Sequence, residues 1–141
     1  SSYFMKKAIE EAKSGLAKGE VPVGAIIVID NKIIARAHNL TESLCDVTAH
    51  AEILAITAAS NFLGSKFLHE CTMYVTLEPC SMCFGALYWS HISRVIYSAK
   101  EKNNGVNVVR SKIHSKTKIE GGVLASQTEI MLKEFFKNKR T

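Results

Sequence analysis

The 141-residue sequence predicts an α/β fold, a three-layer α/β/α sandwich built around a five-stranded mixed sheet. Short apolar runs of strand length alternate with segments in which apolar residues recur at helical spacing. This pattern is typical of a largely parallel sheet that helices cover on both sides. The exception is a hairpin, because the turn residues Asp30 and Asn31 separate two consecutive strands. We expect residues 1–141 to form a single domain, since this length suits one core and no linker or repeat interrupts it.

Three elements are predicted in the N-terminal part of the chain. Residues 3–18 predict a helix that ends at Gly19, because their apolar side chains recur every three or four positions. Residues 23–29 are a continuous apolar run, as expected for a strand that is buried on both faces. Residues 32–37 return from the turn as the second strand of the hairpin.

A second helix is predicted in the middle of the chain. It follows a loop over residues 39–47 and begins around His50. Asp46 or Thr48 is available as its N-cap, since both side chains can accept a hydrogen bond from a free backbone N–H. The helix is expected to end near Gly64.

The remaining elements continue the alternation. A third strand over 73–77 leads directly into a helix over 81–90, and Pro79 suits the first turn of that helix. A fourth strand over 92–97 is followed by a polar loop. We expect this loop over residues 98–112. A fifth strand over 118–123 and a helix over 124–136 should follow it.

The side chains with the strongest chemical signal are one imidazole, one carboxylate and two thiols: His50, Glu52, Cys80 and Cys83. A structural zinc usually has four protein ligands, whereas a catalytic zinc has three and an open position for water. His50, Cys80 and Cys83 make three, so the pattern predicts one catalytic Zn²⁺ per subunit. Both ligand-bearing helices would direct their N-termini at the metal, which favours thiolates.

Such a site could activate water for hydrolysis. The zinc would lower the pKa of its bound water towards about 7, and Glu52 could take and return the proton. One alternative is a structural zinc that only stabilises the fold, and another is a coincidental pair of cysteines. Both remain because a Cys-x-x-Cys pair alone also occurs in redox and structural sites. The added His-x-Glu and the proline before Cys80 favour the catalytic site.

The composition is that of an ordinary globular protein, with 47% hydrophobic and 22% charged residues. We expect no membrane partner, since no apolar run approaches the length of a membrane span and no secretory signal is visible. Four cysteines, two of them assigned to metal, suit a reducing compartment, so we expect a cytoplasmic protein. The net charge of +5 is concentrated in residues 98–141. That basic part could meet a polyanion, or it could be a solvated surface.

His-x-Glu followed by Pro-Cys-x-x-Cys is the signature of the zinc-dependent nucleoside and nucleobase deaminases. Within them, most of this chain resembles the bacterial tRNA adenosine deaminases. The resemblance implies a cytidine-deaminase-like fold and a homodimer. It also implies hydrolysis of the wobble adenosine to inosine in a tRNA anticodon loop, with an arginine tRNA as the expected substrate. The matching stretches are residues 20–25, Asn39, residues 48–52, residues 74–80, residues 121–124 and Phe135-Phe136 with the basic residues after them.

An adenosine pocket also needs walls and polar contacts around the metal. Asn39 could bond a purine edge or a ribose, as its counterpart does in the family, or it could simply end a strand in a turn. Glu101 stands where the family usually has Asp and could contact a ribose hydroxyl, while His91 stands where the family tends to have Arg. The candidate walls, each of which could equally be core, are Pro22, Val23, Phe84 and the backbone around Ala51.

Three hypotheses for the function remain. The first is a tRNA adenosine deaminase, which the basic C-terminal part and Phe135-Phe136 favour. The second is a deaminase of a free nucleobase or nucleoside, namely guanine, cytosine or cytidine. The third is a zinc-stabilised RNA-binding subunit without catalysis, against which Glu52 speaks because a structural zinc site has no need of that carboxylate.

Overall fold

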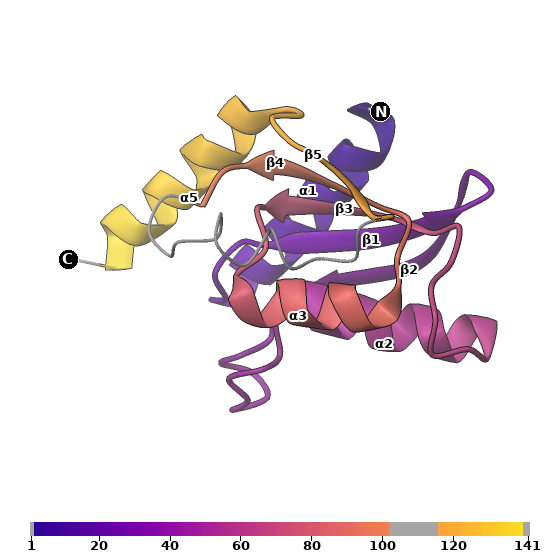
Figure 1. The fold of residues 1–141 in the computed structure, drawn as a ribbon. Coiled ribbons are helices and arrows are strands. Elements are labelled where there is room, and N and C mark those ends of the chain that lie inside the picture. The colour runs from indigo at the N-terminus through magenta and orange to yellow at the C-terminus, as the bar shows by residue number, and fades with distance from the viewer. Residues whose placement is uncertain (1, 102–115, 140–141) are drawn as a thin grey trace.

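The computed structural model describes residues 2–101 and 116–139, which form helices on both faces of a five-stranded sheet (Figure 1). Most of the polar loop predicted over 98–112 lies outside these residues. The helices are α1 (Ser2–Ala17), α2 (Ala51–Leu63), α3 (Ser81–Ser90) and α5 (Ala125–Lys139), and the strands are β1 (Gly24–Ile29), β2 (Lys32–His38), β3 (Thr72–Leu77), β4 (Arg94–Ala99) and β5 (Lys118–Glu120).

The sheet is mixed, as predicted, with the strand order β2-β1-β3-β4-β5. Strand β1 pairs antiparallel with both β2 and β3, and β3, β4 and β5 run parallel. The predicted hairpin is confirmed: Asp30 and Asn31 both have positive φ, at 50° and 61°. Two successive residues with positive φ suit a tight hairpin turn whose twist matches that of the strands.

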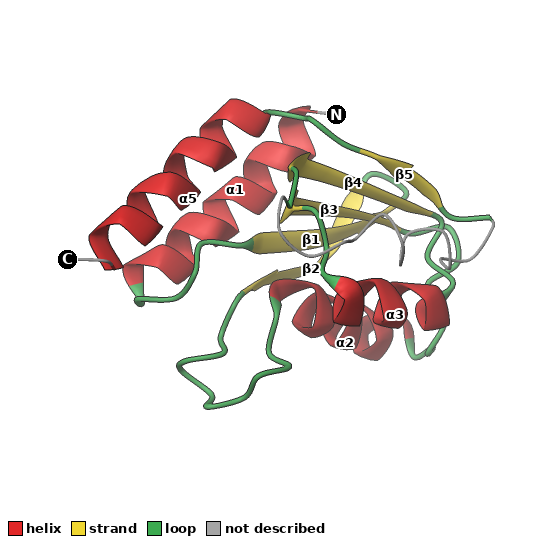
Figure 2. Cartoon of the chain, turned by 60° about the vertical axis from the view of Figure 1, so that its left-hand side comes forward, coloured by secondary structure: helices red, strands yellow, loops and turns green. Residues whose placement is uncertain are grey.

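Helices α2 and α3 cover one face of the sheet, and α1 and α5 cover the other (Figure 2). Side chains on β1 alternate between the two layers, which explains why its sequence is a continuous apolar run. Ala25 and Ile27 pack into the cluster with α2 and α3, whereas Ile26 and Val28 pack into the cluster with α1. The predicted three-layer α/β/α sandwich is confirmed.

The fifth strand is shorter than predicted and ends at Glu120. Gly121 lies against the ring of Tyr97, where a β-carbon would overlap the ring, and Gly122 has φ +92°. The chain therefore leaves the sheet here and turns into α5. In the part of the chain that the structure covers, no helix combines the length and the apolar character needed to cross a membrane.

Candidate active site

The three predicted metal ligands come together at the N-termini of two helices. His50 is the N-cap of α2 and Cys80 is the N-cap of α3, each with an extended backbone and no side-chain capping bond. Cys83 lies on the first turn of α3, so it shares a face with Cys80. Pro79 consequently precedes the N-cap of α3 and is not in its first turn.

The predicted N-cap of α2 was wrong. Asp46 instead accepts hydrogen bonds from the backbone N–H and the hydroxyl of Thr48, at 2.9 and 2.8 Å. His50 takes the capping position, but its imidazole turns towards the two thiols and accepts no hydrogen bond from the backbone N–H groups of the first turn. Those N–H groups and the helix dipole favour negative charge at this point.

The distances among the three side chains fit a zinc ion. His50 Nδ1 lies 3.7 Å from Cys80 Sγ and 3.6 Å from Cys83 Sγ, and the ligand atoms all lie within 4.8 Å of one another. A tetrahedral zinc with ordinary bond lengths places nitrogen and sulfur ligands about 3.6 Å apart. The group can therefore hold a zinc ion with little rearrangement.

The two thiols differ in their protonation. The pKa of Cys80 is lowered to about 5, chiefly because the Cys83 thiol donates a hydrogen bond to it, and this outweighs the effect of burial. The pKa of Cys83 is raised by that same hydrogen bond and by burial. The lowered pKa favours the thiolate form of Cys80, and a zinc ion would displace the proton from Cys83.

Glu52 lies on the first turn of α2, two residues after His50, and only 4% of it is exposed. Burial raises the pKa of its carboxyl to about 7, against the lowering effect of its own backbone N–H. A carboxyl of this pKa can both accept and donate a proton near neutral pH.

A cavity of about 870 Å³ is lined by Glu52 and by two of the candidate zinc ligands, His50 and Cys80, whereas Cys83 is fully buried. Four of the six predicted substrate contacts line it: Val23, Asn39, Ala51 and Glu101. The other two predicted contacts, Pro22 and Phe84, are described by the structure but do not line the cavity. Pro22 is buried. Phe84 lies on α3, and its side chain is 1% exposed because it packs into the core cluster between the sheet and the helices α2 and α3. The remaining lining residues are Val21, Thr41, His50, Glu52, Leu77, Glu78, Cys80, Ala99, Lys100, Glu129, Leu132, Lys133, Phe136 and Lys137.

Asn39 lies at the end of β2 and is 7% exposed. Its backbone N–H donates to the carbonyl of Val23 at 3.0 Å, which joins two parts of the cavity wall. Its side-chain oxygen is buried without a hydrogen-bond partner within the described ranges. A buried acceptor that faces a cavity is suited to a ligand that carries a donor.

Sequence reasoning did not identify the part of the wall that α5 supplies. Glu129, Leu132, Lys133, Phe136 and Lys137 lie at helical spacing and share one face. That spacing was visible in the sequence, but nothing local indicated that this face of the last helix would meet the metal site rather than solvent.

The chain belongs to the cytidine and deoxycytidylate deaminase family, since residues 1–99 match the model of that family's zinc-binding region. More particularly, it is 48% identical to the tRNA-specific adenosine deaminase of Aquifex aeolicus, over 98% of this chain and 95% of that protein. It is 42% identical to the enzyme of the same name from Bacillus subtilis, over 97% of this chain and 89% of the relative.

Solved structures give the same result for the fold. A structure from a study of A-to-I editing by tRNA:A34 deaminases has a TM-score of 0.88 and 38% identity, over 94% of this chain and 100% of the other. A guanine deaminase from Bacillus subtilis has a TM-score of 0.67 and 37% identity, over 79% of this chain and 69% of the other. The predicted cytidine-deaminase-like fold is thereby confirmed.

Proposed function

We propose that this chain hydrolyses the wobble adenosine of a tRNA anticodon loop to inosine and releases ammonia. One observation carries the proposal: two of the three candidate zinc ligands, His50 and Cys80, line the same cavity as the buried Glu52 and several exposed lysines. The high identity to tRNA-specific adenosine deaminases over nearly the whole chain supports the same reaction.

When bound by His50, Cys80 and Cys83, zinc supplies a Lewis acid that activates water at neutral pH. Glu52 moves the protons. Its carboxylate takes a proton from the attacking water and delivers it to N1 of the adenine. It then takes the second proton, from the new hydroxyl on C6, and passes it to the amine, which leaves as ammonia while C6 becomes a carbonyl. The burial of Glu52 in the first turn of α2 raises its pKa to about 7, which suits both steps of this exchange.

The other predicted contacts orient the nucleoside. The free side-chain oxygen of Asn39 accepts a hydrogen bond from the base edge or the ribose. Val23 and the backbone at Ala51 form the flat walls of the pocket, and Glu101 accepts from a ribose hydroxyl. Phe84 belongs to the apolar cluster that contains Ala51 and against which Val23 packs, and Pro22 is buried next to Val23 in the chain.

An RNA loop suits this cavity better than a free base does. The bases of an anticodon loop are already unpaired, so turning one outward is inexpensive. Lys100, Lys133 and Lys137 lie on the cavity wall, where they can meet the phosphates next to the turned-out nucleotide. We infer that an arginine tRNA is the substrate, which also supports a cytoplasmic location.

We further infer that residues 1–141 are one zinc-dependent deaminase domain, with one zinc per subunit, and that two copies form a homodimer. Tyr88 and Trp89 on α3 support the dimer, because both are exposed, Trp89 by 73%, and their rings contact each other edge to face. Such an aromatic pair suits a protein interface. Sedimentation equilibrium of the wild type and of Trp89→Ala tests this, and a wild-type monomer at micromolar concentration would refute it.

The decisive experiment measures inosine in an arginine tRNA anticodon stem-loop incubated with zinc-loaded protein. Wild type should convert the wobble adenosine, and Glu52→Gln should lose turnover while it binds zinc in the same amount. Activity that survives this substitution would refute the role of Glu52.

A parallel assay measures ammonia release from free adenosine, guanine, cytosine and cytidine. Similarity to a guanine deaminase supports the second candidate function, a deaminase of a free base. Ammonia from guanine together with an inert stem-loop would establish that candidate instead. A protein that binds the stem-loop and zinc but releases no ammonia would be the non-catalytic RNA-binding subunit.

A further inference from the structure

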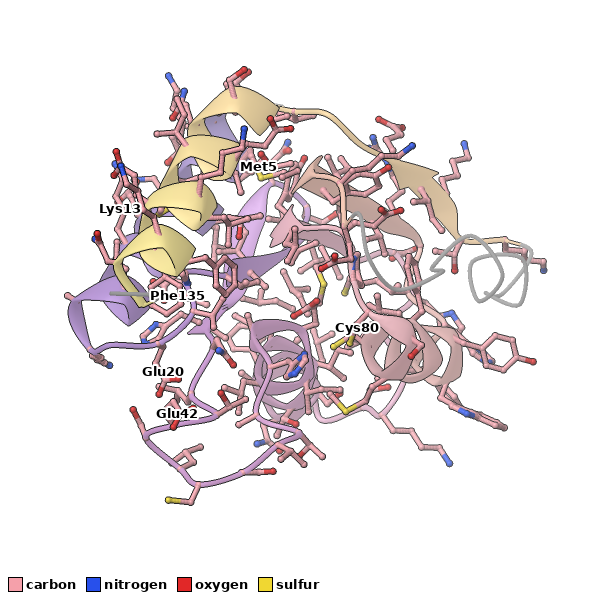
Figure 3. The ribbon with its side chains drawn as sticks, turned by 90° about the vertical axis from the view of Figure 1, so that its left-hand side faces the viewer. Met5, Lys13, Glu20, Glu42, Cys80 and Phe135 are labelled. Carbon is pink, nitrogen blue, oxygen red and sulfur yellow. The ribbon has the colours of Figure 1, made fainter. Side chains whose placement is uncertain are left out.

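The side chain of Glu20 is a buried carboxylate that the reaction does not use. It lies in the connection between α1 and β1 and is fully buried. Its oxygens accept three hydrogen bonds from the loop between β2 and α2: from the backbone N–H of Glu42 at 3.0 Å, from the backbone N–H of Ser43 at 2.7 Å and from the Ser43 hydroxyl at 2.6 Å. Figure 3 shows Glu20 directly beside Glu42 of this loop.

These bonds keep the carboxylate charged. Burial acts to raise the pKa of Glu20, but the hydrogen bonds from Ser43 and Glu42 outweigh burial and hold the pKa below its ordinary value. Hydrogen bonds to an ionised carboxylate are short and about twice as strong as those between neutral groups.

The loop that Glu20 holds extends away from the body of the protein (Figure 2). Residues 42–48 are exposed, and none of them belongs to either apolar cluster. Within the described ranges, the three bonds to Glu20 are the hydrogen bonds that connect residues 41–47 to the chain outside residues 39–50. The carboxylate therefore replaces the apolar contacts that this loop lacks.

The two ends of the loop meet beside the metal site. The backbone N–H of Leu40 donates to the carbonyl of Ala49 at 3.0 Å. Asn39, before the loop, and His50, after it, both line the cavity, and so does Thr41 within it. The shape of the loop thus sets the spacing of residues that face the substrate.

The neighbours of Glu20 along the chain also line the cavity. Val21 follows it directly, and Val23 accepts the backbone hydrogen bond from Asn39. One carboxylate therefore joins two chain segments that form adjoining parts of the wall, the segment 21–23 and the segment 39–41.

We propose that Glu20 is a positioning residue: its carboxylate holds the loop over residues 40–48 in the shape that completes the cavity wall, and thereby strengthens binding of the RNA nucleotide without taking part in proton transfer. The consequence for RNA rests on the proposed function. The anchoring of the loop does not.

Replacement of Glu20 should act on binding more than on chemistry. If the unanchored loop keeps the binding shape about one tenth of the time, the apparent affinity falls about tenfold. We expect Glu20→Ala to raise the KM for the anticodon stem-loop about tenfold and to leave kcat within about twofold. Glu20→Gln should lie between this variant and the wild type, because its amide keeps the size of the side chain and one acceptor oxygen.

Two variants in the loop serve as comparisons. Ser43→Ala removes one of the three bonds and should raise KM less than Glu20→Ala does. Glu42→Ala is the matched control, because only the backbone N–H of Glu42 contacts Glu20. Its KM should equal that of the wild type or fall below it, since an exposed negative charge is removed next to an RNA site.

The experiment combines steady-state kinetics with amide hydrogen exchange on the zinc-loaded variants. Faster exchange at residues 42 and 43 in Glu20→Gln, together with a raised KM and unchanged zinc content, would support the proposal. Unchanged exchange, or a fall in kcat at constant KM, would overturn it. A wild type that is inert on the stem-loop would refute the proposed function instead, and the exchange rates would still decide whether Glu20 anchors the loop.

Discussion

A buried pair of hydroxyl groups joins α5 to the sheet, in addition to the apolar packing of Met131. Thr128 is the one buried residue among residues 125–138, and its Oγ1 lies 2.8 Å from Oγ of Ser98 on β4, which is also fully buried. The same helix supplies Lys133, Phe136 and other residues to the cavity wall. A perturbation of this pair should therefore affect both stability and substrate binding.

Thr128→Val keeps the shape of the side chain and removes the hydroxyl. Ser98 is then left with a buried hydroxyl without its partner, which costs about 1–3 kcal/mol of unfolding free energy. Ser98→Ala should cost less, about 0.5–1 kcal/mol, because the freed hydroxyl of Thr128 can bond the carbonyl one turn earlier in the helix. The double variant leaves no unsatisfied hydroxyl, so its loss should be about 1 kcal/mol smaller than the sum of the two single losses.

Urea unfolding of the zinc-loaded proteins, followed by far-UV circular dichroism, gives the three free-energy differences. We also expect Thr128→Val to raise the KM for the stem-loop, since the helix that carries the lysines is less firmly held. Single losses that add up in the double variant to within about 0.3 kcal/mol would show that the two hydroxyls are not coupled and would refute this account.

Four other predictions follow from the structure. Gly24→Ala should destabilise the protein by about 2–3 kcal/mol in urea unfolding, because its β-carbon would overlap backbone atoms of Ala8 and Ala12; a loss below about 0.5 kcal/mol would contradict this. Lys133→Gln should weaken stem-loop binding and lower the salt slope of the affinity by about 0.7, as expected for one phosphate contact to a single strand; an unchanged slope would place Lys133 away from the phosphates. Removal of zinc by a chelator should lower the Tm, since metal binding stabilises only the folded chain, and an equal Tm would argue that zinc is not bound. The contribution of Glu20 to stability, measured against Glu20→Gln, should be constant above its ordinary pKa of 4.5 and shrink as the pH falls through its lowered pKa; a contribution that grows on acidification would refute the charged state.

The reacting group could be predicted from the sequence because its geometry is local. His50 and Glu52 belong to one helix start, and Cys80 and Cys83 belong to another, so the spacing within each pair depends on a single turn of backbone. Only the approach of one pair to the other depends on tertiary structure. We could predict that approach because a catalytic zinc needs three protein ligands at one point. The capping of α2 was mispredicted because His50 occupies the position that Asp46 or Thr48 could have taken.

The cavity walls were less predictable, because burial alone does not tell a wall from the core. Val23 and Phe84 are both apolar residues that we predicted as pocket walls. Val23 lines the cavity, whereas Phe84 points from α3 into the core between that helix and the sheet. In the sequence, Glu20 stood out only as part of residues 20–25, which resemble the tRNA adenosine deaminases. Its role as an anchor could not be predicted, because its hydrogen-bond partners lie more than twenty residues later in the chain. Contacts at such sequence separation depend on the packing of the whole sheet.

The division of the cavity between two parts of the chain has an evolutionary consequence. Residues 1–99, which match the family model, contain the metal group and Glu52, whereas α5 supplies a separate part of the wall through Lys133 and Phe136. Because α5 has little buried surface of its own, mutations can accumulate on it without loss of the reaction. Selection can therefore change which molecules enter the pocket by altering α5, while the inherited hydrolytic residues stay intact.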